Sequence, residues 1–202
     1  MPIDLPAEWV PYIVEARLER SYVSDLRPLA ALTELRRLVL TRSRISDIAP
    51  LAALRRLQYL HLSFTAVRDL TPLAGMSELQ GCFLTGSLVQ DITPLAKLVR
   101  LERLDLGDTQ VSDVAPLAGL HRLWSLDLSG TRVANIAQLS GLTGLQYLDL
   151  SSTTVTDLSA LTQLASLRWL VLRHTEAAVP ELPKCEVIRA PVAARSARYA
   201  RQ

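Results

Sequence analysis

Hydrophobic residues recur along the chain with a fixed period of 22 residues. Leucine opens the unit without one slip in spacing at Leu35, Leu57, Leu79, Leu101, Leu123, Leu145 and Leu167, and Ile13 extends the series one unit earlier. Further apolar residues follow three and five positions later, so each unit begins with the pattern L-x-x-L-x-L. A repeat of this length predicts a solenoid, in which stacked coils bury one another's apolar side chains.

Two kinds of local structure are predicted within each unit. The L-x-L alternation predicts a short strand, because side chains two apart on a strand share one face, here the interior. Most units then carry Asp followed three residues later by Pro, as at Asp47 and Pro50. Asp can bind nearby backbone amides and Pro ends regular pairing, so the chain should bend there. The closing P-L-A-x-L segment predicts one turn of 3₁₀ or α-helix on the outer face.

The expected fold class is therefore α/β: a curved, right-handed stack of β/3₁₀-α coils with a parallel β-sheet on the concave face. Residues 13–188 should form about eight coils of the 22-residue type and a short closing coil. The closing coil restarts at Leu182 as L-x-x-C-x-V, a step of 15 residues from Leu167 instead of 22. Its strand should be the ninth of the sheet.

The two ends depart from the repeat. Residues 1–12 are interpreted as an N-terminal cap, with Trp9 and Tyr12 covering the open first coil; a partner contact by Trp9 is the alternative. Residues 189–202 are interpreted as a basic tail, because they carry arginines and no acidic residue. A solvated end is favoured for this tail over a contact with nucleic acid or acidic lipid.

A column of hydroxyl residues occupies one position in every unit: Ser21, Ser43, Thr65, Ser87, Thr109, Thr131, Thr153 and Thr175. A hydroxyl can donate and accept hydrogen bonds over a short reach, so these residues are expected to satisfy buried backbone groups. We interpret the column as structural.

At this point the repeat resembles a known family. The unit L-x-x-L-x-L-x-x-T-x-V-x-D-L-x-P-L-A-x-L is similar to the 22-residue leucine-rich repeat of the bacterial internalins and of the SDS22-like phosphatase regulators, over residues 13–188. The resemblance implies a leucine-rich-repeat solenoid that binds protein on its concave face. This sequence has Ser or Thr where those repeats usually have Asn.

Composition narrows the function classes. Hydrophobic residues make up 49% of the chain and aromatic residues 5%, so aliphatic side chains must build the core. The net charge of +2 gives no general argument for nucleic acid or an anionic membrane, and no apolar run is long enough to span a bilayer. Cys82 and Cys185 are expected to be core residues without a disulfide. No signal peptide is visible, so the protein is expected in the cytoplasm, or secreted without such a signal as an effector.

The sequence contains no recognisable catalytic constellation. His61, His121 and His174 lie on different coils, and metal-binding, phosphate-binding and nucleophile-elbow motifs are missing from the sequence. A regular strand lattice also supplies neither a strained nucleophile nor an oxyanion hole. We therefore expect no enzyme activity, no cofactor and no resident metal.

The outward positions beside the strand leucines predict the binding surface. Along the coils they run from basic, through aromatic, to acidic and again to aromatic. Large aromatic side chains and Arg are common interface anchors. The predicted partner-binding residues are Tyr59, His61, Phe64, Phe83, Arg103, Asp105, Asp127, Tyr147, Asp149, Trp169 and Arg173.

Two features of this surface have alternative interpretations. The aspartates could keep the strand face soluble, recognise a basic partner or form a weak calcium site, and one of them should bind a proton more readily than usual because like charges repel. Phe64 and Phe83 could mark a partner contact or pack among themselves.

The function predicted from this surface is a monomeric protein–protein interaction module that uses the concave β-face. The alternatives are a self-associating scaffold and the recognition domain of a larger regulatory or effector protein. Nucleic acid is not an expected partner.

Overall fold

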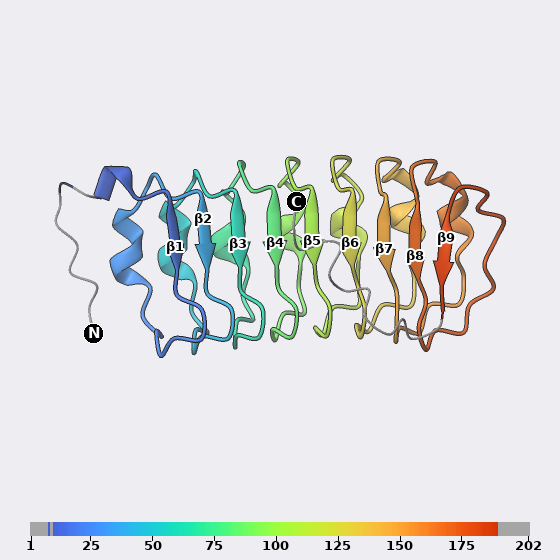
Figure 1. Cartoon of the computed structure of the whole chain (residues 1–202), viewed down its shortest axis with the longest axis horizontal. Coiled ribbons are helices and arrows are strands. Elements are labelled where there is room, and N and C mark those ends of the chain that lie inside the picture. Colours follow the sequence, from blue (N-terminus) through green and yellow to red (C-terminus); the bar gives the residue numbers. More distant parts are fainter. Residues whose placement is uncertain (1–7, 9, 190–202) are drawn as a thin grey trace.

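The computed structural model describes residue 8 and residues 10–189. Within them, nine short strands form one parallel sheet in sequence order (Figure 1). The strands are β1 (Glu15–Arg17), β2 (Arg37–Val39), β3 (Tyr59–His61), β4 (Gly81–Phe83), β5 (Arg103–Asp105), β6 (Ser125–Asp127), β7 (Tyr147–Asp149), β8 (Trp169–Val171) and β9 (Glu186–Ile188). The predicted solenoid with a parallel sheet is confirmed.

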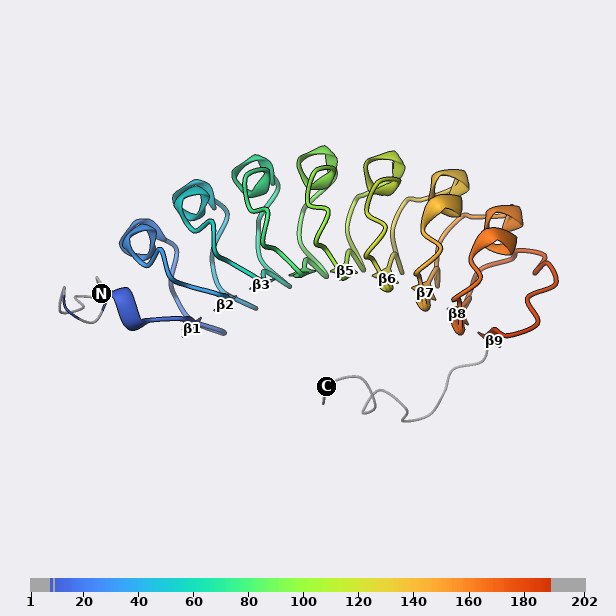
Figure 2. The ribbon, with the colours of Figure 1, turned by 90° about the horizontal axis from the view of Figure 1, so that it is seen from above.

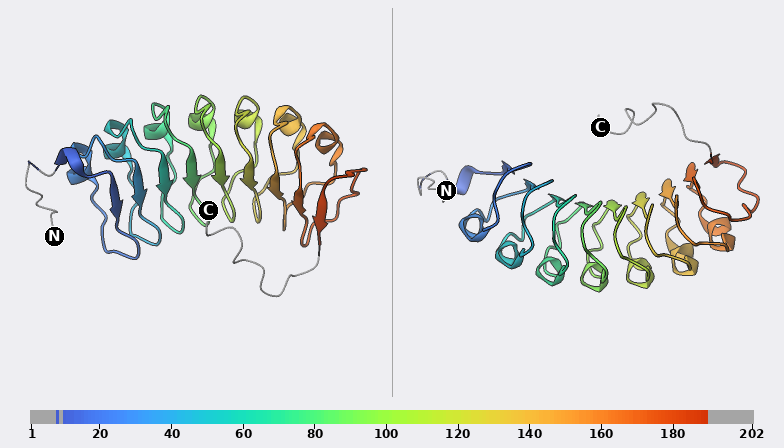
Figure 3. Two further views of the ribbon diagram at one scale, coloured as in Figure 1. Left: turned by 45° about the horizontal axis from the view of Figure 1, so that its top comes forward. Right: turned by 90° about the horizontal axis from the view of Figure 1, so that it is seen from below.

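The other side of each full coil carries a short 3₁₀ helix. These helices are η2 (Arg27–Ala31), η3 (Ala49–Ala53), η4 (Thr71–Leu73), η5 (Thr93–Leu95), η6 (Ala115–Leu117), η7 (Ala137–Gly141) and η8 (Ser159–Gln163), and a further short helix, η1 (Val10–Tyr12), precedes β1. Seen from above, the coils form an arc with strands along its inner side and η2–η8 along its outer side (Figure 2). Two further views show the same arrangement (Figure 3).

An aspartate builds the turn before most of these helices. The Asp47 Oδ1 atom accepts a hydrogen bond from the Ala49 backbone N–H at 2.8 Å. The same bond recurs at the same distance for Asp69, Asp91, Asp113 and Asp157. The predicted role of these aspartates is confirmed, and it places the following Pro in the first turn of η3, η4, η5 and η6.

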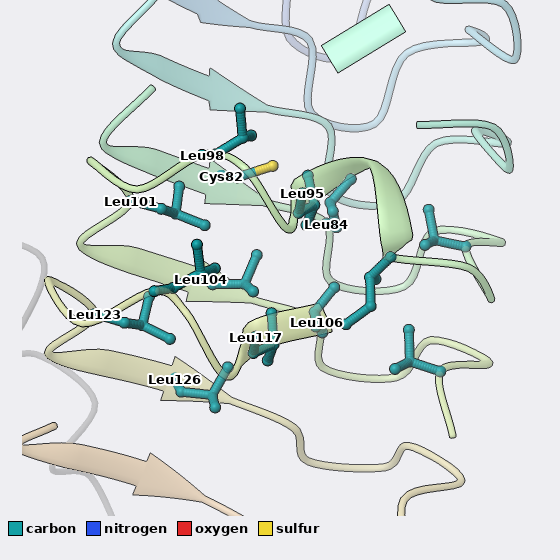
Figure 4. Packing of buried hydrophobic residues seen from close by; sticks show 14 of the residues in the cluster. Cys82, Leu84, Leu95, Leu98, Leu101, Leu104, Leu106, Leu117, Leu123 and Leu126 are labelled. Carbon is teal, nitrogen blue, oxygen red and sulfur yellow. The ribbon is translucent and has the colours of Figure 1, made fainter. Parts of the chain in front are cut away.

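The core is a continuous column of aliphatic side chains. In Figure 4, Leu104 of β5, Leu106 directly after β5 and Leu117 of η6 point into one interior. Leu106 has no exposed surface. Cys82 takes a strand leucine's place, and burial raises the pKa of its thiol to about 12, so it stays protonated. It is the small core residue that the sequence predicts.

The hydroxyl column serves the backbone of its own coil. Thr109 Oγ1 donates to the Leu106 carbonyl at 2.6 Å, and the same local bond is made by Ser21, Ser43, Thr65, Thr131 and Thr153. Thr175 differs, because its hydroxyl donates to the Leu150 carbonyl of the preceding coil at 2.7 Å. Ser87 Oγ is buried without a hydrogen-bond partner in the described part of the chain.

Thr109→Val is expected to lower the free energy of unfolding by about 1 kcal/mol, because the Leu106 carbonyl loses one donor inside the core. Urea unfolding measures the change. Ser87→Ala is the control, since the Ser87 hydroxyl makes no hydrogen bond with the described residues. An equal loss in both variants would contradict the structural role assigned to the column.

The first coil is not covered as predicted. Tyr12 is 81% exposed, so the expectation that it lies over the core is wrong. Val10, on the same short helix, is the residue that packs against the core. An aliphatic side chain fits against the leucines of the first coil with no polar group to satisfy. Trp9 and the tail from residue 190 onward lie outside the described residues.

The closing coil is confirmed, but its register is not the predicted one. Val187 pairs with Leu170, an offset of 17 residues where the sequence pattern predicts 15. A two-residue shift keeps the same side chains facing inward, because strand side chains alternate with period two. Leu182, Cys185 and Val187 therefore still pack against the core, each partly buried.

No helix within the described residues has both the length and the apolar character needed to cross a membrane.

Candidate functional site: the concave face

The strand register brings the predicted site residues into two neighbouring columns. One column runs Tyr59, Gly81, Arg103, Ser125, Tyr147 and Trp169, and the other runs His61, Phe83, Asp105, Asp127 and Asp149. The residue between them on each strand points into the core, so both columns lie on the concave side. Phe64 and Arg173 follow β3 and β8 and border the same surface.

The first group of site residues is an arginine–aromatic platform, formed by Arg37, Tyr59, His61, Phe83 and Arg103. The His61 and Phe83 rings stack with centroids 4.3 Å apart and an angle of 7° between planes. The Arg37 Cζ atom lies 5.6 Å from the centroid of the Tyr59 ring. The Arg103 Cζ atom lies 5.3 Å from that of Phe83. The rings thus make contacts among themselves and carry a cation on either flank.

Gly81 allows these rings to lie close to the sheet. A Cβ atom on Gly81 would lie 2.7 Å from Tyr59 Cδ1 and 3.0 Å from Phe83 Cε2, closer than side chains approach. The missing side chain leaves the space into which both rings lean. The sequence places Gly81 in the outward column, but only the structure shows that the rings of Tyr59 and Phe83 lie over it.

Repulsion and burial keep the platform histidine neutral. Burial, followed by the positive charges of Arg37 and Arg103, lowers the pKa of His61 to about 4. The Nε atoms of both arginines and Nε2 of His61 are buried without a hydrogen-bond partner among the described residues. Arg37 Nε approaches Glu15 Oε1 at 3.9 Å, but Glu15 binds Arg17 more closely, at 2.7 Å.

Phe64 forms the exposed edge of the aromatic region. Its backbone is left-handed, with φ of 57°, and its side chain is among the large hydrophobic residues exposed in the described part. The ring lies over Gly86, where a Cβ would be 2.6 Å from Phe64 Cδ1. The Arg42 Cζ atom lies 4.3 Å from the ring centroid.

The left-handed backbone recurs at this position in every full coil and was not foreseen from the sequence. Its members are Arg20, Arg42, Phe64, Gly86, Asp108, Gly130, Ser152 and His174. Gly at two of the eight positions was the available signal, since glycine adopts this conformation without steric cost. The other six residues are held there by the repeated turn.

The second group is an aspartate row, formed by Asp105, Asp127 and Asp149 on adjacent strands. Each Oδ1 atom accepts a hydrogen bond from the backbone N–H two residues later, at 2.8 to 3.0 Å. Tyr147 donates its hydroxyl to Asp149 Oδ2 at 3.2 Å. Within the described residues, the row forms no ion pair with Lys, Arg or His. No cation of the described residues therefore compensates its negative charge.

The middle carboxylate of the row holds a proton more readily than an ordinary aspartate. Burial, and then repulsion by Asp105, raises the pKa of Asp127 to about 6. Repulsion from Asp149 acts in the same direction. The expected effect of stacked carboxylates is confirmed, with burial as the larger cause.

A second aromatic pair lies beyond the row. Tyr147 and Trp169 are register partners on β7 and β8, and both are half-buried. Burial and the nearby aspartates raise the pKa of the Tyr147 hydroxyl, which keeps it a hydrogen-bond donor. A hollow of about 500 Å³ opens beside Trp169, lined also by Gln146, Lys184 and Glu186. Arg173 has its Nε atom buried without a hydrogen-bond partner in the described structure.

The described residues contain no group of three His, Cys, Asp or Glu side chains placed to hold a metal ion. The Asp row follows the strand spacing, and each of its carboxylates turns one oxygen to its own backbone. Calcium is bound by six to eight oxygen atoms, and the remaining oxygens of these aspartates supply fewer than that.

Solved structures provide the comparison that decides the fold family. An internalin (inlF) from Listeria monocytogenes superposes with a TM-score of 0.84 at 26% identity, over 87% of this chain and 52% of that one. The chain has the leucine-rich-repeat fold. An internalin C2 (inlC2) from the same species follows with a TM-score of 0.76 at 29% identity, over 85% of this chain and 74% of that one.

A leucine-rich-repeat protein from Leptospira interrogans has the same fold, with a TM-score of 0.82 at 21% identity. It matches over 91% of this chain and 51% of its own length. The leucine-rich-repeat protein described here thus spans about half the length of that relative and of inlF. No family model and no curated protein sequence matches the chain.

Proposed function

We propose that this leucine-rich-repeat protein is a protein–protein interaction module that binds its partner on the concave β-face. The observation that carries the proposal is the aspartate row, which has no cation partner among the described residues. Its middle member, Asp127, has a raised pKa, so its charge costs stability in the folded chain. A costly charge on an accessible face is explained by a contact with another molecule.

The aromatic side chains support the same face. Tyr59 and Phe83 present partly exposed rings on the adjacent strands β3 and β4, with Phe64 45% exposed beside them, and Trp169 presents another partly exposed ring on β8. Rigid rings flanked by arginines are the side chains that most often dominate binding energy in interfaces. Stacking on His61 holds the Phe83 ring in place, and arginines lie over the rings of Tyr59, Phe64 and Phe83; these contacts lower the entropy lost on binding.

The remaining parts of the proposal follow from the same surface. The module acts as a monomer without enzyme activity, in the cytoplasm or as a secreted effector, and can form the recognition part of a longer protein. The outward side chains stand on a regular parallel sheet. Such a surface is wide enough to contact a macromolecule but does not enclose a small substrate. Light scattering at two concentrations tests the monomer, and a mass that rises with concentration would favour the self-associating scaffold.

Phe83→Ala is expected to weaken partner binding about tenfold while leaving the fold intact, because it removes the ring that stacks on His61 and lies beneath Arg103. The parent chain is immobilised to capture proteins from the source cells, and mass spectrometry identifies them. Titration of the purified partner with the parent chain and with Phe83→Ala then gives the two affinities.

Val99→Ala is the matched control, since Val99 is a large exposed hydrophobic residue outside the strands. Equal binding by the parent chain and Phe83→Ala, or equal weakening in both variants, would contradict a binding site on the concave face.

A further inference from the structure

Charge is distributed unevenly along the concave face. The arginine–aromatic platform spans β2 to β5 and carries the cations Arg37 and Arg103, with Arg42 close by over the Phe64 ring. The aspartate row spans β5 to β7. Positive and negative zones therefore lie next to each other along the arc, in sequence order.

The two zones do not neutralise each other. Arg103 and Asp105 belong to the same strand, yet Arg103 forms no ion pair within the described residues. Its guanidinium instead lies over the rings of Phe83 and Trp124, at 5.3 and 5.5 Å from their centroids. Stacking uses the flat faces of a guanidinium, whereas its N–H edges are the part that binds a carboxylate in a bidentate manner.

The platform has unsatisfied donors and no carboxylate within it. Arg103 Nε and Arg37 Nε are buried atoms without an acceptor in the described structure. Glu15, the acid nearest to Arg37, lies on β1 at the edge of the sheet and is engaged by Arg17. The Arg37 side chain as a whole is 43% exposed, so a carboxylate arriving from another chain can reach its guanidinium although the Nε atom itself is enclosed.

The aspartate row offers the complementary chemistry. Each carboxylate turns Oδ1 to its own backbone, and Asp127 also receives a hydrogen bond from the Ser129 side chain, but neither Asp105 nor Asp127 is paired with a cation in the described residues. A lysine or arginine side chain would both bind these oxygens and relieve the repulsion along the row.

We propose that the concave face binds a polypeptide segment whose acidic and basic side chains are segregated, with its carboxylates on the arginine–aromatic platform and its basic groups on the aspartate row. This inference rests on the proposed function and specifies the chemistry of the partner. The centre of the platform lies between β3 and β4 and that of the aspartate row at β6, about 12 Å apart at the strand spacing of a sheet. An extended peptide covers that distance with about three to four residues.

Two labelled synthetic peptides of identical composition test the proposal. In one, glutamates and lysines form separate blocks joined by a spacer of about three to four residues; in the other, they alternate. Fluorescence anisotropy with the full chain measures both affinities at low and physiological salt. The segregated peptide is expected to bind about tenfold more tightly, with a preference that falls as salt rises. Equal affinities for the two peptides would overturn the proposal.

Variants assign the preference to the two zones. Arg103→Gln and Asp127→Asn should each remove most of the preference for the segregated peptide. Arg122→Gln is the control, because Arg122 is exposed and lies outside the strands. An equal loss in Arg122→Gln would show a general charge effect and overturn the assignment. Thermal melts of each variant establish that it is folded.

A single-stranded DNA competitor separates a peptide site from a nucleic-acid site. Its phosphates would meet the aspartate row, so we expect no displacement of the segregated peptide. Displacement would overturn the proposal. If Phe83→Ala weakens the captured partner while both peptides bind alike, the concave site stands and the charge proposal fails. If the segregated peptide is preferred while Phe83→Ala has no effect on the captured partner, the proposed function fails and the preference of the concave face for segregated charge stands.

Discussion

Leu106→Ala is expected to lower the free energy of unfolding by about 2–5 kcal/mol, the cost of deleting most of a buried leucine side chain. Leu106 has no exposed surface and packs within the column that runs through all coils. Neighbouring coils stack through three-residue strands, so little backbone pairing compensates for a cavity between them. Urea unfolding followed by circular dichroism measures the loss.

Phe83→Ala provides the contrast, because Phe83 lies on the same sheet but points to the concave side. Its removal costs the stacking with His61 and opens no cavity in the core. It should therefore lose clearly less stability than Leu106→Ala. If the two variants unfold at the same urea concentration, the assignment of inward and outward faces is wrong.

Asp127→Asn is expected to stabilise the chain at pH 7 by about 1–3 kcal/mol, since one pKa unit corresponds to about 1.4 kcal/mol. The pKa of Asp127 is about 6 in the fold against an ordinary value of 3.8. The folded chain thus binds the proton more tightly than the unfolded chain, and its stability rises as pH falls from above 6 towards 4. The asparagine keeps the acceptor for the Ser129 N–H and removes the charge.

Unfolding at several pH values tests this sign. The gain from Asp127→Asn should be largest at neutral pH and disappear near pH 4, where the folded parent chain is already protonated. Asp91→Asn is the control, because hydrogen bonds from Thr93 lower the pKa of Asp91 in the fold. It should give no stabilisation at neutral pH. A loss of stability in Asp127→Asn at pH 7 would contradict the idea of an uncompensated carboxylate.

The sequence was sufficient for the architecture because the repeat over-determines it. The period of 22 residues, the L-x-L strands and the Asp–Pro turns all agree, and the pairs such as Asp105 with Asp127 follow from the period alone. The ends were predicted less well. Tyr12 is exposed and the Val187 register differs by two residues, because each end has a neighbouring unit on one side only to enforce the pattern.

The site was predicted as a set of outward positions, but its internal contacts were not. Stacking of His61 on Phe83, and the support of the rings by Gly81 and Gly86, depend on rotamers that a periodic pattern does not specify. The separation of Arg103 from Asp105 also could not be foreseen, since two residues so close on one strand would be expected to pair. Which residues bind a partner stays a prediction.

The constant strand register sets how the two charged zones can vary between related chains. Each coil pairs residue i with residue i + 22 from β1 to β8, so one whole coil can be gained or lost without disturbing the pairing of the others. Such a change between β5 and β6 would move Asp127 and Asp149 relative to the platform by one strand spacing, about 4.8 Å, while Asp105 stays beside Arg103 on β5. The distance between the two zones therefore changes in steps of one strand spacing. A change in the number of repeats can match this distance to partners of different length, while each coil keeps its structure.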